Sequence, residues 1–115
     1  MRDDRVYLQD ILEAIERIEK YAARGRQEFD RDELIQTWVI YYIQIIGEAT
    51  RKLSQGFRAK HPEIPWQQIA AMRNILVHDY FQIDVDEVWS VVETDLPGFR
   101  KKMEAMFKEL DSSPS

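Results

Sequence analysis

Cysteine is absent from this 115-residue chain, and histidine is limited to two positions. The lack of cysteine excludes disulfide frameworks, thiolate zinc sites and cysteine nucleophiles, and it is compatible with a reducing compartment. Long apolar runs are also missing: the longest, residues 38–43, is far shorter than the roughly 20 residues that span a bilayer. The first residues contain no apolar signal region. We therefore expect a cytoplasmic protein.

An excess of basic residues is missing too, since 16 Lys and Arg stand against 21 Asp and Glu, for a formal charge of −5. With 44% apolar residues, the chain is long enough for one domain with a single core and too short for two. We assign residues 1–110 to this domain and residues 111–115 to a flexible C-terminal tail. Basic residues nevertheless gather between residues 49 and 78, where five of them accompany one acidic residue.

Glycine and proline are few, with four of each, and they lie between or near the ends of segments with helical periodicity. This pattern predicts an all-α, antiparallel bundle of four to five helices. A first helix is expected to end just before Gly25. Asp30, with Glu33 three residues later, predicts the start of the second helix, and Phe29 and Leu34 are spaced as its hydrophobic staple.

The second helix has an apolar arc too wide for a single packing contact, so we expect it to be central. The extra width is buried either in the core of the monomer or in a self-association surface. Gly56 is expected to end this helix, and Pro65 to begin the third. A last helix is expected to start at Asp84 and to be kinked or broken near residues 94–97, because a proline lies there.

Polar side chains gather at the end of the third predicted helix and just after it. They are Arg73, Asn74, His78, Asp79 and Tyr80. On a regular helix, Asn74 and His78 lie about 40° apart, whereas Arg73 and His78 lie about 140° apart. Either the helix loosens before His78, or residues from two protomers converge across a two-fold axis.

The segment RNILVHDY resembles the R-x4-H-x-Y signature of the HEPN superfamily, specifically the HepT-type toxins encoded beside minimal nucleotidyltransferase antitoxins. The blocks RVYLQDILEAIERIEKY, YYIQIIGEATRKLS and PEIPWQQIAAMRNILVHDYF resemble that family in order and spacing. The resemblance implies a helical bundle, a homodimer and metal-independent cleavage of RNA. The sequence has no glycine-rich phosphate loop, paired catalytic carboxylates or plausible metal cluster, so we expect no cofactor and no metal.

Cleavage of RNA without a metal requires a base for the 2′-hydroxyl proton and a donor that stabilises charge on the phosphate. His78 suits the first role, because its pKa lies near neutrality, and Arg73 suits the second. Asn74 either orients His78 or binds phosphate, and Asp79 is a further supporting residue. The family's Gly-Glu pair suggests that Glu48 contacts this site; an exposed position is the alternative. His78 could instead serve as a partner of the helix dipole.

The resemblance also implies that Tyr80 is modified with AMP by a partner nucleotidyltransferase, which silences the toxin. The alternative is a tyrosine that packs beside Phe81. Four further basic residues are candidates for binding RNA. They are Arg51, Lys52, Arg58 and Lys60. The alternative for these four is an ordinary solvated helix end.

Two other functions remain open on the sequence. In the first, the chain is a noncatalytic helical module that partners a nucleotidyltransferase or binds nucleotide without turnover. In the second, it is a structural dimer.

Overall fold

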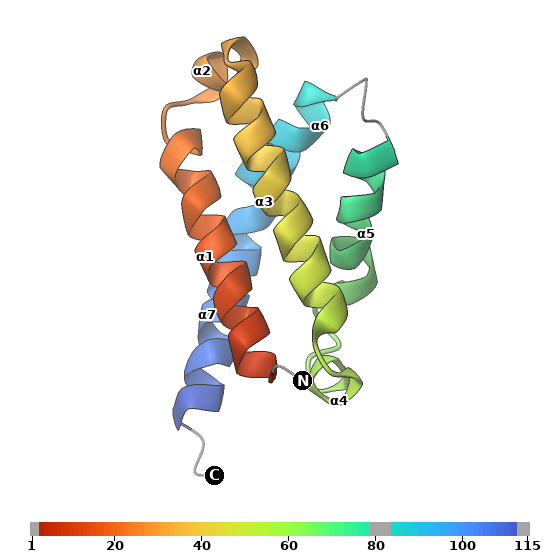
Figure 1. Cartoon of the computed structure of the whole chain (residues 1–115). Helices are drawn as coiled ribbons and strands as arrows, with labels where there is room; N and C mark the ends of the chain where they lie inside the picture. Colours follow the sequence, from red (N-terminus) through yellow and green to blue (C-terminus); the bar gives the residue numbers. More distant parts are fainter. Residues whose placement is uncertain (1–2, 79–83, 113–115) are drawn as a thin grey trace.

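Four long helices dominate residues 3–78 and 84–112, the part of the chain that the computed structural model describes; side chains are described at 3–72 and 84–110. The four run alternately up and down the molecule (Figure 1). They are α1 (Asp4–Ala22), α3 (Glu33–Lys52), α5 (Trp66–His78) and α7 (Leu96–Ser112). Helix α3 packs against both α1 and α5, and α7 packs against α1. The central position expected for the second long helix is confirmed.

Shorter helical segments connect the long helices. They are α2 (Arg26–Arg31), α4 (Gln55–Ala59), α6 (Val85–Ser90) and a π-helical turn, η1 (Val91–Asp95). Every regular element in the described ranges is helical, which confirms the predicted all-α bundle. The helix count exceeds four to five because the prediction treated the short helices as connections or as parts of longer helices. Among the described helices, none combines the length and the apolar character needed to cross a membrane.

The facing sides of α1 and α3 supply a large part of the core. Leu8, Ile11, Ile15 and Ile18 recur on one side of α1 and are fully buried. They meet a second buried stripe on α3, which contains Ile35, Val39, Ile43 and Ile46. Each such side chain contributes about 1.5–3 kcal/mol when removed from water. The spacing of apolar residues thus fixes which sides of these two helices face each other.

The predicted start of the second long helix is wrong. Asp32, not Asp30, is the N-cap of α3: its carboxylate accepts hydrogen bonds from the backbone N–H groups of Leu34 and Ile35. Leu34 is 80% exposed, so it forms no hydrophobic staple with Phe29, which is buried. Asp30 lies inside α2, a helix that the sequence pattern did not predict.

Gly25 explains why the chain forms α2 at this point. Its φ of 97° lies in the region that L side chains rarely adopt, and it lets the chain turn directly after α1. The carbonyl of Gly25 then accepts from Phe29 N–H and starts the first turn of α2. A second capping residue is therefore needed before α3.

The predicted stop at Gly56 is also wrong, because Gly56 lies within α4. Helix α3 ends earlier, where Leu53 adopts an extended conformation with ψ of 144°. Ser54 then caps α4 through its hydroxyl, which accepts from Phe57 N–H at 3.1 Å. The same hydroxyl donates to the Asp4 carboxylate at 2.7 Å, and this bond ties the start of α4 to the start of α1.

The third predicted helix begins close to its predicted position, and the predicted last helix is divided into α6, η1 and α7. Helix α5 starts one residue after Pro65, whose carbonyl accepts from Ile69 N–H. Asp84 caps α6 by accepting from Glu87 N–H at 3.1 Å. The interruption expected near residues 94–97 occurs as the π-helical turn that immediately precedes α7. Helix α7 extends through Ser112, so it includes two residues assigned to the tail.

Candidate functional site

Helix α5 carries three of the predicted site residues in its C-terminal half. The backbone is α-helical from Trp66 through His78, so Arg73, Asn74 and His78 all lie on one continuous helix. Their side chains, and the whole of Asp79 and Tyr80, lie outside the part of the chain that is described. The helix does not loosen before His78. The angle of about 140° between Arg73 and His78 therefore applies.

Glu48 has described contacts with two of the residues predicted to bind RNA. Its Oε1 lies 2.9 Å from Arg51 Nη2 and 3.7 Å from Lys52 Nζ. All three residues lie in the last two turns of α3, and the side chains of Arg51 and Lys52 are about half exposed. The carboxylate offsets part of the positive charge at this helix end. Because ion pairs between exposed side chains are weak, the contact with Glu48 leaves both cations accessible to solvent.

The other two candidates, Arg58 and Lys60, lie in and just after α4. Trp66, the first residue of α5, donates from its indole Nε1 to the backbone carbonyl oxygens of Arg58 and His61, at 3.1 and 2.9 Å. These bonds hold the α4 region against the beginning of α5.

The predicted cations therefore lie at the beginning of α5, whereas Arg73 lies near its middle and His78 at its end. Figure 1 shows α4 and the end of α3 beside the start of α5, whereas His78 terminates α5 at the far end. With a rise of 1.5 Å per residue, α5 separates the two ends by about 18 Å. Along the helix axis, Arg73 is about 10 Å from Trp66, so the cations are closer to Arg73 than to His78.

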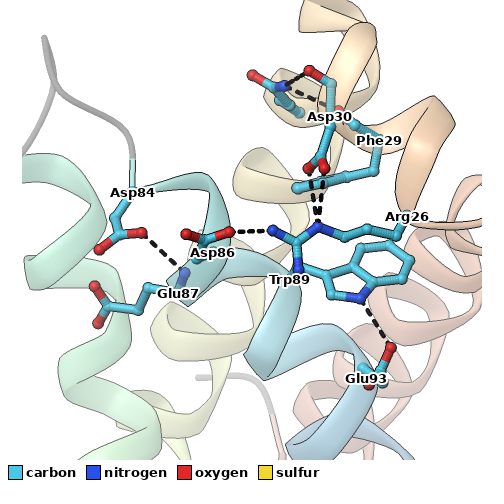
Figure 2. A network of polar contacts seen from close by, with 9 residues as sticks. Arg26, Phe29, Asp30, Asp84, Asp86, Glu87, Trp89 and Glu93 are labelled. Atoms are coloured by element: carbon cyan, nitrogen blue, oxygen red, sulfur yellow. Dashed lines mark hydrogen bonds and ion pairs between the residues drawn. The ribbon is translucent and has the colours of Figure 1, made fainter.

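A polar network anchors the beginning of α6, the first element described after the predicted site (Figure 2). Arg26 Nε donates to the Asp30 carboxylate at 2.9 Å within α2, and Arg26 Nη2 donates to Asp86 of α6. The hydrogen bond with Asp30, aided by Asp86, raises the pKa of Arg26 above its usual value. Sequence reasoning missed this network because its two helices are far apart in the chain.

Aromatic packing reinforces the same junction. The Trp89 ring of α6 packs on Phe29 of α2 with centroids 5.1 Å apart, and its indole N–H donates to Glu93 at 2.8 Å. Both rings are buried. The polar network and this ring pair together hold α6 against α2.

A groove of about 400 Å³ lies between α5 and the η1–α7 segment. Apolar side chains from α5 and from the η1–α7 segment line this groove. They include Ile69, Met72, Leu96 and Phe99. Polar groups are placed among them. These are Gln68, Thr94, Asp95 and Lys102. Sequence reasoning did not predict this groove.

The acidic and histidine side chains of the described residues form no cluster of three or more that could hold a metal ion.

Comparison with known proteins identifies relatives across most of the chain. Residues 11–106 match a family model described as ribonuclease HepT-like. A probable ribonuclease HepT from Thermococcus cleftensis is 41% identical over 108 residues, which cover 93% of this chain and 98% of that protein. A putative RNase from Methanocaldococcus jannaschii is 38% identical over 104 residues, or 90% of this chain and 95% of that protein.

A third relative, also from Methanocaldococcus jannaschii, is a gamma-glutamylcyclotransferase and putative RNase. It is 39% identical over 113 residues, which cover 97% of this chain. This chain spans only about half of that protein, 51% of its length. No solved structure matches the chain significantly.

Proposed function

This chain belongs to the HepT-like ribonuclease family, and we propose that it is the toxin of a toxin–antitoxin pair, cleaving RNA without a metal ion. The observation that carries the proposal is the family match over residues 11–106, which includes all of α5 and its R-x4-H motif. In this proposal Arg73 and His78 are the catalytic residues. Asn74 and Asp79 support them, and Glu48 acts from the end of α3, where it holds Arg51 and Lys52.

The chemistry follows from the two residue types. His78 accepts the proton of the 2′-hydroxyl, and the resulting oxygen attacks the adjacent phosphorus atom. Arg73 stabilises the negative charge on the phosphate oxygens, because its guanidinium stays charged and offers two parallel donors. The 5′-oxygen of the next nucleotide leaves with a proton from water or an acid. No step requires a cofactor.

A homodimer is part of the proposal because one copy of α5 directs Arg73 and His78 to different sides of a regular helix. A surface on α3 supports self-association. Leu34 and Tyr41, seven positions apart, lie on the same side of the helix, and they are 80% and 55% exposed. A second copy would remove this apolar surface from water. Two sites would then form, each with Arg73 of one protomer and His78 of the other.

Control by modification is the third part of the proposal. A partner nucleotidyltransferase transfers AMP from ATP to Tyr80: the phenol oxygen bonds to the α-phosphorus, pyrophosphate leaves, and the phenol loses its proton. The adduct adds bulk and negative charge two residues after His78. Both effects oppose binding of an anionic substrate near Arg73.

The cleavage proposal is tested by incubating the purified protein with total RNA in excess chelator. We expect the wild-type protein to cleave and both Arg73→Ala and His78→Ala to lose cleavage. The matched control is His61→Gln, which alters the other histidine of the chain. His61 precedes α5, and its ring packs on Phe57 with ring centroids 5.2 Å apart. Cleavage by His78→Ala at the wild-type rate would contradict the assignment of His78 as the base.

The modification proposal is tested by intact-mass analysis after co-expression with the proposed partner, a minimal nucleotidyltransferase. We expect an AMP adduct on the wild-type protein and none on Tyr80→Phe. Tyr21→Phe, which changes a partly buried tyrosine on α1, is the control and should keep the adduct. Equal adducts on wild type and Tyr80→Phe would place the modification elsewhere.

A further inference from the structure

We propose that the groove between α5 and the η1–α7 segment binds one unstacked base of the RNA substrate, and that guanine fits it best. This inference rests on the proposed ribonuclease function and adds a subsite to it. The groove is lined from α5 by Ile69 and Met72, the latter directly before Arg73 in the chain. Arg73 follows Ile69 by four positions, so the two lie about 40° apart on the helix.

The position of the groove along α5 supports an RNA ligand. Arg58 and Lys60 lie at the beginning of α5, and the motif occupies its second half, from Arg73 to His78. The groove borders the helix between these two regions, from Pro65 to Met72. A single strand that contacts the cations at one end and the cleavage site at the other would pass the groove opening.

The size and walls of the groove suit a flat aromatic ring. Its volume of about 400 Å³ lies within the range of roughly 300–1,000 Å³ for small-molecule sites. Ile69, Met72 and Phe99 supply apolar surface. Proteins that recognise single-stranded RNA place splayed bases against such side chains and bind the Watson–Crick edges with hydrogen bonds.

The polar groups of the groove favour guanine. Asp95 and Thr94 are on the η1 side, and Gln68 is on the α5 side. A carboxylate accepts two parallel hydrogen bonds, and guanine offers two neighbouring donors, N1–H and N2–H, on one edge. Lys102, also at the groove, supplies a positive charge for a phosphate of the same strand. An apolar helix seated here would cover Asp95 without giving it a partner, which costs free energy.

Gly98 provides a way to block the groove without disturbing the core. It lines the groove on α7, and a Cβ atom added there would meet no atom within 4 Å. Gly98→Leu therefore introduces bulk at the groove while improving the helix propensity. Gly56 of α4 also has open space around an added Cβ and lies outside the groove, so Gly56→Leu is the matched control.

Binding can be measured separately from cleavage by NMR of protein labelled with ¹³C in its methionine methyl groups. We expect GMP to shift the Met72 methyl in a saturable way and to leave the buried Met103 methyl unchanged. IMP lacks the N2 amino group of guanine and should bind at least about fivefold more weakly. Asp95→Asn should weaken GMP binding similarly, and Gly98→Leu should abolish the shift, whereas Gly56→Leu keeps it.

Two results of this titration would overturn the inference. The first is no saturable shift of Met72 with any nucleoside monophosphate. The second is equal affinity for GMP and IMP together with unchanged affinity in Asp95→Asn.

Cleavage kinetics then separate this inference from the proposed function. We expect Gly98→Leu to raise KM for a guanine-containing RNA about tenfold, with kcat retained. No cleavage by the wild-type protein would contradict the proposed function itself. Wild-type cleavage with an unchanged KM in Gly98→Leu would contradict only the base subsite. If that variant also lost binding to the nucleotidyltransferase, the groove would be a protein-docking surface.

Discussion

The two sides of the bundle differ in how completely they are closed. Between α1 and α3, side chains such as Ile15 and Ile43 are almost wholly buried. A hydrogen bond also links the two helices, because Trp38 Nε1 donates to the Arg17 carbonyl at 2.9 Å. Among the described long helices, only α3 makes extensive contacts with α5. A groove separates α5 from α7. The helix that carries the motif thus belongs to the open side.

Helix α7 connects the two sides. Toward α1, its Arg100 binds Glu19 at 2.6 Å, and Glu104 of the next turn accepts from Arg100 Nε at 2.7 Å. Toward α5, the same helix presents Gly98 and Lys102 to the groove. One face of α7 thus stabilises the bundle, and the other leaves room for a ligand. We infer that the α1–α3 side maintains the fold while the α5 side accommodates substrate.

The largest expected effect is on stability. Ile15→Ala, in the closed side, should lower the free energy of unfolding by about 2–5 kcal/mol, because it removes fully buried methyl groups and leaves a cavity. Met72→Ala, at the groove, should cost about 1 kcal/mol or less, because Met72 is only partly buried. Urea unfolding followed by circular dichroism measures both. Equal losses would contradict the difference between the two sides.

A smaller effect tests the corrected start of α3. Asp32→Ala should destabilise the protein by about 1 kcal/mol, because two backbone N–H groups lose their acceptor. Asp30→Ala removes only an exposed contact with Arg26 and should destabilise it less. The same unfolding measurement applies. A greater loss of unfolding free energy in Asp30→Ala than in Asp32→Ala would contradict the assignment of Asp32 as the N-cap of α3.

The smallest effect concerns the open side. Gly98→Ala should stabilise the protein by about 0.4–1 kcal/mol, because alanine restricts the unfolded chain and favours the helix, and its Cβ meets no neighbour. Thermal unfolding should show a higher Tm for this variant. A lower Tm would mean that the groove at Gly98 is narrower than the structure shows.

The periodicity of apolar residues predicted that α1 and α3 are helices, because their buried side chains recur at helical spacing. It could not choose between Asp30 and Asp32 as the helix cap, because both are good capping residues and the choice depends on α2. Pro97 indicated the interruption near residues 94–97, but the π-helical form of that turn depends on packing. Local signals therefore located the main elements more reliably than their junctions.

The site shows a similar division. The R-x4-H-x-Y spacing is local, so sequence alone identified Arg73 and His78 as candidates. The distance from these residues to Lys60 could not be predicted from the sequence. It depends on α5 being one straight helix, in which each residue adds 1.5 Å along the axis. The groove was missed for the same reason: Met72 and Lys102 are brought to one cavity only by the packing of α5 and α7.

The central claim is that cleavage uses Arg73 of one protomer and His78 of the other. It is tested by mixing and reassociating the inactive variants Arg73→Ala and His78→Ala. Random pairing makes half of the dimers mixed, and each mixed dimer has one intact site of two. The account predicts that about a quarter of the wild-type RNA cleavage returns. No recovery, although the mixed dimer forms, would contradict the claim, because both residues would then act within one protomer.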